Sequence, residues 1–307
     1  MPDIIILPTA EKTYNAVTAI QLYNYLLVFW RDELGNIHYS RTMDGTTWSP
    51  SGNSRIGETT KSPFATVFND KIYIFWKSND PSNLIYYSQS LFLFSGRLDT
   101  EWSGERVINT VDTTAEAVTA VQFYNSLFIF WRDELDNIRF SRTLDGTTWE
   151  SSDSIGTLGK TAKSPFAAVF KEKLYVFWKS NDPSNHIYCS RSDAAHGLLS
   201  GRAEWAPSTH LINTFDTTPE AVTAVAFHDG LYVFWKSNDP SNRIYWSRSE
   251  DGVSWPPGEV LKFHGETYTT PKSPFATVFN DKIYIFWIQK DPVLGECCSD
   301  IYYNGIC

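Results

Sequence analysis

The residues best suited to chemistry recur at one position of a repeated segment. A tryptophan is followed by an arginine or lysine and then by acidic or amide side chains, as Trp-Arg-Asp-Glu at 30–33 and 131–134 and as Trp-Lys-Ser-Asn-Asp at 76–80, 178–182 and 235–239. A sugar stacks its C–H face on an aromatic ring, while its hydroxyls need fixed donors and acceptors. We therefore expect carbohydrate sites here. The candidate ligand-binding residues are Trp30, Arg31, Asp32, Trp76, Lys77, Asn79, Trp131, Arg132, Asp133, Trp178, Lys179, Asn181, Trp235, Lys236 and Asn238.

The same tryptophans also have a purely structural interpretation. Each one alternates with apolar positions, and it can fill the space between packed sheets while the neighbouring Lys or Arg lies over it. Both interpretations are open at the level of sequence. A sixth copy reads Trp287-Ile288-Gln289-Lys290 and lacks the cation after the tryptophan, so a site there is expected to be altered or absent.

A second recurring motif joins an aspartate, a glycine and a tryptophan, as TMDGTTW (42–48), TLDGTTW (143–149) and SEDGVSW (249–255). An aspartate before a glycine forms a tight turn whose carboxylate accepts backbone N–H groups. A catalytic site needs a unique, asymmetric set of groups, whereas these carboxylates occupy equivalent positions. We expect Asp44, Asp145 and Asp251 to be structural.

No other pattern indicates catalysis or metal binding. The histidines show no His-x₃-His spacing, and no Gly-x-Ser-x-Gly is present. Cys297 and Cys298 are adjacent, which suits neither a zinc site nor a redox Cys-x-x-Cys; either a bridge to Cys307 or free thiols would fit. Cys189 takes an aromatic position of the repeat and is expected in the core. We expect no catalytic residue, no metal ligand and no cofactor.

The elements that position these residues follow from the repeat. The dipeptide Phe-Trp ends at residues 30, 76, 131, 178, 235 and 287, in the same frame each time. Within one copy, segments 18–24, 25–32 and 37–42 are predicted as strands a, b and c, and a fourth strand d is clearest at 106–109 and 210–213. Strand b is apolar on both faces, so both faces must be covered, and radially packed blades provide that cover.

The repeat predicts an all-β, six-bladed β-propeller of four-stranded antiparallel blades in a single domain. Copies one, three and five begin Ala-Val-Thr-Ala, whereas the others begin Lys-Ser-Pro-Phe-Ala, which indicates three duplicated pairs. The last copy ends after strand c, so the N-terminal strand 3–7 is expected to close it. The blades are approximately 16–57, 62–109, 117–156, 164–213, 221–262 and 273–307 plus 3–7.

Composition and charge limit the classes of partner that we expect for this protein. A net charge of −9 and a sequence pI near 5.2 argue against nucleic acid, which requires clustered basic residues. No apolar run approaches the roughly 18 residues that a membrane span needs, so no membrane insertion is expected. The N-terminus has no basic region and only a short apolar run, which predicts a cytoplasmic protein or secretion without a classical signal peptide.

The Asp-Gly turns resemble the Asp-box of sialidase-like propellers, Ser/Thr-x-Asp-x-Gly-x-Thr-Trp, with one residue fewer between Asp and Gly. That resemblance implies a structural turn away from the ligand face. The arginine cluster, the Tyr–Glu nucleophile pair and the Arg-Ile-Pro context of those enzymes are not found. The arginines Arg41, Arg142, Arg191 and Arg248 share one repeat position instead. A glycoside hydrolase of sialidase-like fold and a protein-interaction or toxin scaffold are the alternative functions.

Sixfold repetition without a unique catalytic set resembles the propeller lectins of fungi and bacteria, in which equivalent pockets between blades bind sugars multivalently. The resemblance implies glycans or glycoproteins as partners and sites on the b–c loop face. If only one pocket per blade pair binds, the selector is expected in residues that alternate at the blade entrances. These residues are Lys61, Lys163 and Lys272 against Asn15, Glu116 and Glu220.

Overall fold

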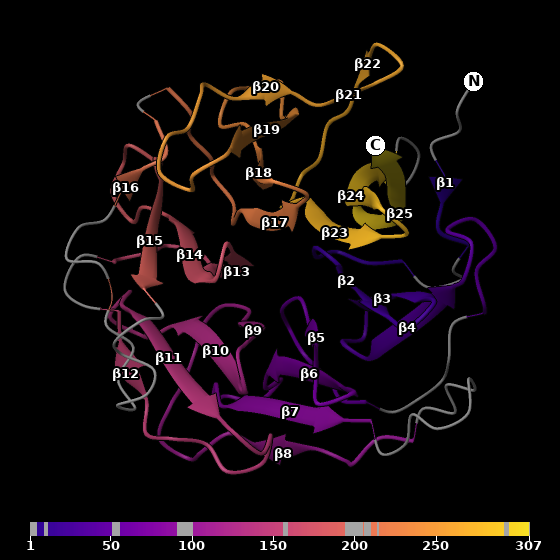
Figure 1. The fold of residues 1–307 in the computed structure, drawn as a ribbon. Coiled ribbons are helices and arrows are strands. Elements are labelled where there is room, and N and C mark those ends of the chain that lie inside the picture. Colours follow the sequence, from indigo (N-terminus) through magenta and orange to yellow (C-terminus); the bar gives the residue numbers. More distant parts are fainter. Residues whose placement is uncertain are drawn as a thin grey trace.

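The fold is a ring of six antiparallel sheets arranged as the blades of a propeller (Figure 1). The structure is a computed structural model, and it describes residues 5–8, 12–50, 56–90, 101–155, 159–193, 205, 210–213, 215–291 and 295–306, with the side chains of 193 and 290–299 outside that description. The six-bladed all-β prediction is confirmed. The described residues include no helix long and apolar enough to cross a membrane.

The innermost a strands surround the axis of the ring. They are β2 (Thr18–Leu22), β5 (Phe64–Phe68), β9 (Thr119–Phe123), β13 (Phe166–Phe170), β17 (Thr223–Phe227) and β23 (Phe275–Phe279). The b strands follow them along the chain. They are β3 (Tyr25–Arg31), β6 (Lys71–Lys77), β10 (Ser126–Arg132), β14 (Lys173–Lys179), β18 (Gly230–Lys236) and β24 (Lys282–Asp291).

The c and d strands complete the blades toward the outside. The c strands are β4 (Ile37–Thr42), β7 (Ile85–Gln89), β11 (Ile138–Thr143), β15 (Ile187–Asp193), β19 (Ile244–Ser249) and β25 (Gly295–Ile306). The d strands are β8 (Arg106–Val107), β12 (Asp153–Ser154), β16 (His210–Leu211), β20 (Glu259–Val260) and β1 (Ile5–Ile6). Blade 1 shows three strands within the described residues, and a hairpin of β21 (Lys262–Phe263) and β22 (Glu266–Thr267) follows blade 5.

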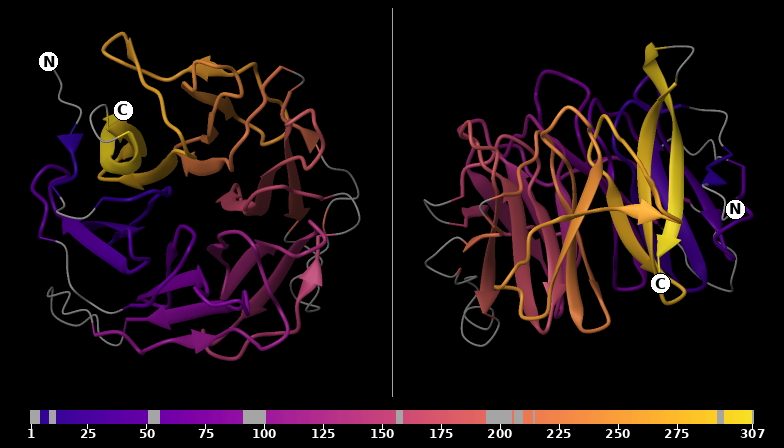
Figure 2. Two further views of the ribbon diagram at one scale, coloured as in Figure 1. Left: turned by 180° about the vertical axis from the view of Figure 1, so that it is seen from behind. Right: turned by 90° about the horizontal axis from the view of Figure 1, so that it is seen from above.

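The two ends of the chain meet in one sheet, as the sequence predicts. Strand β1 pairs antiparallel with β25, with Ile5 opposite Tyr303 and Ile6 opposite Tyr302. The amide of Leu7 donates to the carbonyl of Ile301 at 2.8 Å. Figures 1 and 2 show the N-terminal strand beside the C-terminal one. The predicted closing strand is confirmed at Ile5–Ile6, and residues 3 and 4 of the predicted range lie outside the described residues.

The core lies between blades because each b strand is apolar on both faces. In one cluster, Phe128 and Phe130 of β10 pack with Leu174 and Val176 of β14, and the other clusters likewise join neighbouring blades. Cys189 is 1% exposed and lies opposite Phe177, and burial raises the pKa of its thiol to about 12, which confirms a core thiol. The predicted alternatives for Cys297, Cys298 and Cys307 concern side chains outside the described residues.

The Asp-Gly turns carry the structural role expected of them. The carboxylate of Asp145 accepts the backbone N–H groups of Thr147 and Thr148, each at 2.7 Å, and Asp44 and Asp251 do the same in their turns. The tryptophan that ends the turn packs on the preceding blade: Trp149 meets Phe75 edge-on at 5.7 Å. Each turn therefore links two blades.

Candidate functional site

The six tryptophans of the Phe-Trp motif lie between blades and are 0 or 1% exposed. Each of five stacks on a ring from the adjacent c strand; Trp76 and Tyr86, for example, have ring centroids 6.2 Å apart. A ring without exposed surface offers no face for a sugar to stack on. The burial of Trp30, Trp76, Trp131, Trp178 and Trp235 therefore favours the gap-filling interpretation.

The lysines after these tryptophans are also buried. Lys77, Lys179 and Lys236 are 8%, 6% and 9% exposed. The amino groups of Lys77 and Lys179 donate to the carbonyls of Ser78 and Ser180, at 3.0 and 2.8 Å. Removal from water disfavours the charged form and lowers the pKa of all three lysines. They lie beneath the loop face rather than on it.

The aspartates of blades 1 and 3 hold the b–c loops. Asp32 accepts hydrogen bonds from the backbone N–H of Asn36 at 2.8 Å and pairs with Nε2 of His38 at 2.9 Å. Asp133 accepts the backbone N–H groups of Leu135 and Asn137 at 2.9 and 2.8 Å. A carboxylate that accepts hydrogen bonds from its own loop fixes the backbone of that loop and of the arginine beside it. Asp32 and Asp133 therefore hold the loop in place, and their carboxylates are occupied by these bonds.

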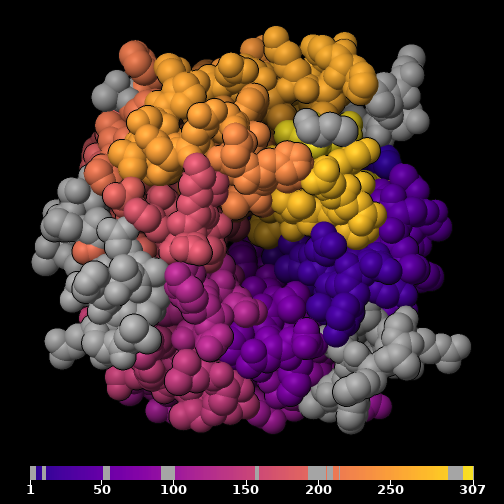
Figure 3. Space-filling model, in the orientation of Figure 1, coloured from indigo at the N-terminus to yellow at the C-terminus, as the bar shows by residue number. Residues whose placement is uncertain are grey.

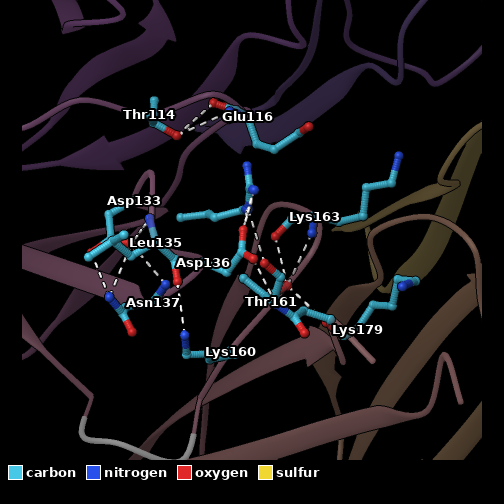
Figure 4. Close-up of polar contacts among 12 residues, drawn as sticks. Thr114, Glu116, Asp133, Leu135, Asp136, Asn137, Lys160, Thr161, Lys163 and Lys179 are labelled. Atoms are coloured by element: carbon cyan, nitrogen blue, oxygen red, sulfur yellow. Dashed lines mark hydrogen bonds and ion pairs between the residues drawn. The ribbon is translucent and has the colours of Figure 1, made fainter. Parts of the chain in front are cut away.

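In the gap between blades 3 and 4, an internal carboxylate occupies the space between the predicted site residues. Nε of Arg132 donates to Asp136 at 2.7 Å, and Nδ2 of Asn181 donates to the other oxygen of Asp136, also at 2.7 Å. Lys160 donates to the carbonyl of Leu135 at 3.2 Å. Figure 4 labels Asp136 near Thr161, whose amide donates to the Asp136 carbonyl, and it labels Lys160 and Leu135 in the same gap. Arg132 and Asn181 are brought together, but each is already paired with Asp136.

The gap between blades 1 and 2 has the same backbone frame without that carboxylate. The amide of Thr59 donates to Gly35 at 2.8 Å, just as the amide of Thr161 donates to Asp136 at 2.9 Å. Gly35 thus stands in the place of Asp136. Within the described structure, the guanidinium of Arg31 donates one bond, to the carbonyl of Glu33 at 3.3 Å, and its Nε is buried without a partner.

An acceptor and an amide complete the blade 1–2 gap. Glu58 occupies the position of Lys160, because Asn36 bridges to Glu58 as Asn137 bridges to Lys160. Nδ2 of Asn79 reaches the carboxylate of Glu58 at 3.5 Å. Sequence reasoning identified Asn79 but missed Glu58, Gly35 and Asp136. The available signal was the one-residue difference between RDELGN (31–36) and RDELDN (132–137).

In blade 5 the predicted asparagine differs in its contacts from those of blades 2 and 4. Its b–c loop has the Lys-Ser-Asn-Asp form of blades 2 and 4, and Asn238 is exposed. Across the described residues, no hydrogen bond of the Asn238 side chain is seen. Asp239 accepts the amide of Ser241 at 2.6 Å, which fixes this loop as it fixes the loops of blades 2 and 4.

The residues that alternate at the blade entrances converge on one place. Asn15, Lys61, Glu116, Lys163, Glu220 and Lys272 all line a cavity of about 140 Å³ on the ring axis, with four residues from every blade. Lys61 pairs with Glu116 at 3.1 Å and Lys163 with Glu220 at 3.2 Å. The sequence predicts these residues at separate blade entrances, whereas in the structure they all line one cavity. Figure 3 shows a depression at the centre of the ring on the face drawn there.

The described side chains include no cluster of three or more His, Cys, Asp or Glu residues that could hold a metal ion. The carboxylates of the loop face instead accept bonds from neighbouring amides and hydroxyls. The chemistry available on this face is therefore hydrogen bonding and ion pairing by arginine, lysine, amide and carboxylate groups.

Comparison with known proteins relates the fold to lectins. No protein-family profile matches the chain, and no curated protein matches its sequence. A mutant of the Aleuria aurantia lectin in complex with Fucalpha1-6GlcNAc is similar in structure, with a TM-score of 0.64, 14% identity and coverage of 97% of this chain and 96% of that one. The SapL1 lectin in complex with alpha methyl fucoside gives 0.63, 13%, 90% and 89%. A Dyadobacter fermentans protein of unknown function gives 0.67, 11%, 98% and 96%. At these identities the likeness shows the six-bladed fold that fucose-binding fungal lectins also have.

Proposed function

We propose that this protein is a non-catalytic lectin that binds sugars between its blades on the b–c loop face. The observation that carries the proposal is the blade 1–2 gap, where Asn79 reaches Glu58 and where Arg31 Nη2 lies 3.8 Å from the position of a Cβ at Gly35. The internal carboxylate that pairs with Arg132 and Asn181 in the blade 3–4 gap has no counterpart at Gly35. An arginine donates two parallel N–H groups, and a carboxylate accepts hydroxyls, so the set fits two neighbouring hydroxyls of a sugar. The similar lectin structures with bound fucosides support this choice of ligand.

The charges of the gap favour a neutral sugar. Arg31 brings a positive charge and Glu58 a negative one, so an acidic sugar would meet repulsion from Glu58 as well as attraction from Arg31. Fucose carries no charge, and we propose a fucoside as the first ligand to test. The buried tryptophans then act as the scaffold that holds strand b, and the sugar contacts come from the loop residues.

Under this proposal, the gaps between blades differ in their affinity for sugar. Asp136 fills the blade 3–4 gap, while Lys77, Lys179 and Lys236 are buried beneath their loops. Binding to glycans or glycoproteins then uses several unequal sites. Weak single sites gain about 10²–10⁴ in avidity when several engage one surface, provided that the geometry allows simultaneous contact.

The test exchanges the residue that distinguishes the two gaps. Calorimetric titration of alpha methyl fucoside into the protein should show binding that Gly35→Asp lowers about tenfold or more, because the new carboxylate pairs with Arg31 as Asp136 pairs with Arg132. The mirror variant Asp136→Gly with Lys160→Glu should raise the number of sites, because it frees Arg132 and Asn181 and supplies the acceptor that Glu58 provides in the blade 1–2 gap. Far-UV spectra of both variants check that the fold is intact.

A blank glycan array together with no effect of Gly35→Asp on any sugar would refute the proposal. Turnover of a fluorogenic glycoside that is lost on changing one residue would indicate the hydrolase alternative. Capture of a protein partner that free sugar does not displace would indicate an interaction scaffold.

A further inference from the structure

The cavity on the ring axis has an aromatic floor. Phe64, Phe166 and Phe275 begin strand a in blades 2, 4 and 6, and their ring centroids lie 5.9 to 6.1 Å from one another in edge-on contacts. The other lining residues include valines and threonines from the odd blades and prolines and serines from the even blades. The apolar surface of the three phenylalanine rings favours a ligand with an apolar body.

The rim of the cavity is charged, and its charges do not balance. Three lysines and two glutamates surround it, and two of the lysines are paired, Lys61 with Glu116 and Lys163 with Glu220. The third glutamate position is taken by Asn15. Lys272 consequently has no acidic partner on the rim within the described residues. An ammonium group left unpaired beside an apolar cavity is a binding point for an anion.

The surroundings add positive charge. Lys77 and Lys179 lie close enough to Lys61 and Lys163 that, after desolvation, the rim lysine is the next cause that lowers the pKa of each. Lys236 is buried as well; after burial, Glu220 raises its pKa and Lys272 lowers it. Six lysines thus lie at or near the rim against its two glutamates, in a protein of net charge −9. Local potential, rather than net charge, governs which small ions enter a cleft.

The size of the cavity limits the ligand. Its volume of about 140 Å³ is close to that of an apolar protein cavity of about 150 Å³ that holds one benzene molecule. One six-membered ring, or an alkyl chain of similar volume, fits such a space. A free sugar would place some of its hydroxyls against the three phenylalanine rings, where they have no hydrogen-bond partner, which is costly.

We propose that the cavity on the ring axis binds a small organic carboxylate. The apolar body of this ligand lies on Phe64, Phe166 and Phe275, and its carboxylate binds Lys272. This site is distinct from the gaps between blades, and the inference does not depend on the sugar-binding proposal. It also assigns a role to the asparagine that breaks the threefold pattern: Asn15 leaves Lys272 available.

Sodium benzoate is the probe, and benzamide is its neutral control of the same shape. Ligand-observed NMR titration should show saturable binding of benzoate to the wild-type protein and at least about tenfold weaker binding of benzamide, because a hydrogen-bonded charge is lost. Asn15→Glu completes the third ion pair on the rim and should weaken benzoate binding about tenfold. Asn15→Gln keeps a neutral amide and should bind as the wild type does.

Lys272→Met gives a second test that does not add a charge. It should reduce benzoate binding to the level of benzamide while leaving benzamide binding unchanged. Absence of saturable benzoate binding, equal binding of benzoate and benzamide, or no effect of either Asn15→Glu or Lys272→Met would overturn the proposal. Inorganic phosphate that displaces benzoate with equal affinity would also overturn it, because the apolar floor would then contribute nothing.

Discussion

At the scale of single residues, one position in the b–c loop distinguishes two gaps that otherwise share a backbone frame. Asp136 can occupy its place because its φ of 67° is tolerated by aspartate, and its carboxylate then finds both Arg132 and Asn181. Gly35, with φ of 95°, leaves Arg31 without that partner. Under the proposed function, the carboxylate of Asp136 marks the position that a ligand group would take in the blade 1–2 gap.

The turn aspartates predict the response of stability to acid. Backbone N–H groups, first those of Thr47, Thr148 and Ser254, hold the pKa values of Asp44, Asp145 and Asp251 well below the usual range. Because the folded-state pKa is lower than the unfolded value, their stabilisation is fully present above about pH 4 and is lost as the pH falls below that. Thermal melts from about pH 5 to about pH 2 should show falling melting temperatures. The triple variant Asp44→Asn, Asp145→Asn, Asp251→Asn should show a shallower fall, and an unchanged slope would contradict this account.

At the scale of elements, the Asp-Gly turns fit between blades because the glycine has no side chain. A Cβ at Gly146 would lie 1.9 Å from the hydroxyl of Tyr73 in the preceding blade, and Gly45 and Gly252 approach Tyr284 and Tyr175 in the same way. Two separate reasons require glycine at this position. The backbone is left-handed, and the tyrosine of the preceding blade leaves no room for a Cβ. The turn is therefore both a hairpin and an inter-blade contact.

Gly146→Ala should destabilise the protein more than Gly104→Ala does. Both glycines have nearly equal positive φ, 76° and 77°, but a Cβ at Gly104 meets nothing within 4 Å. The backbone cost of about 1–2 kcal/mol is then common to both variants, and Gly146→Ala adds an overpacking cost of about 1–3 kcal/mol. Urea unfolding of the two variants measures the difference. Equal destabilisation would show that Tyr73 moves aside freely.

At the scale of the whole molecule, blades 6 and 1 close the ring through two sets of contacts. Strand β1 pairs with β25, and the hydroxyl of Tyr303 accepts from Nε1 of Trp48 at 2.6 Å while it donates to the carbonyl of Gly45 at 3.0 Å. Tyr303 is fully buried. Residues more than 250 positions apart are thus joined at the seam where the chain begins and ends.

Tyr303→Phe should weaken this seam by about 1–3 kcal/mol, because Nε1 of Trp48 and the carbonyl of Gly45 lose a partner in the interior. Tyr87→Phe is the matched control in blade 2, where Nε1 of Trp149 has no hydrogen-bond partner within the described residues. Differential scanning calorimetry should show a larger drop in melting temperature for Tyr303→Phe. If Tyr87→Phe is equally damaging, the hydrogen bonds at the seam are not what stabilises closure.

The sequence by itself determined the strands, because alternation and turn residues are local properties. It also determined the six blades and the closing strand, because a comparison of the repeated segments gives their number and the strand that the last copy lacks. The two apolar faces of strand b require neighbours on both sides, and that requirement is visible in a segment such as 71–77. Equally local were the turn role of Asp44 and the core position of Cys189. The exact blade boundaries stay predictions.

Only the tertiary structure decided which side chains meet across blades. Asn181 reaches Asp136 over 45 residues, and Lys61 reaches Glu116 over 55, so neither pairing is contained in a local pattern. The same holds for the six entrance residues, which surround one cavity because the blades are arranged radially around it. Burial of the tryptophans beneath the loops likewise depends on the neighbouring blade, since a strand cannot specify alone how closely another sheet packs against it.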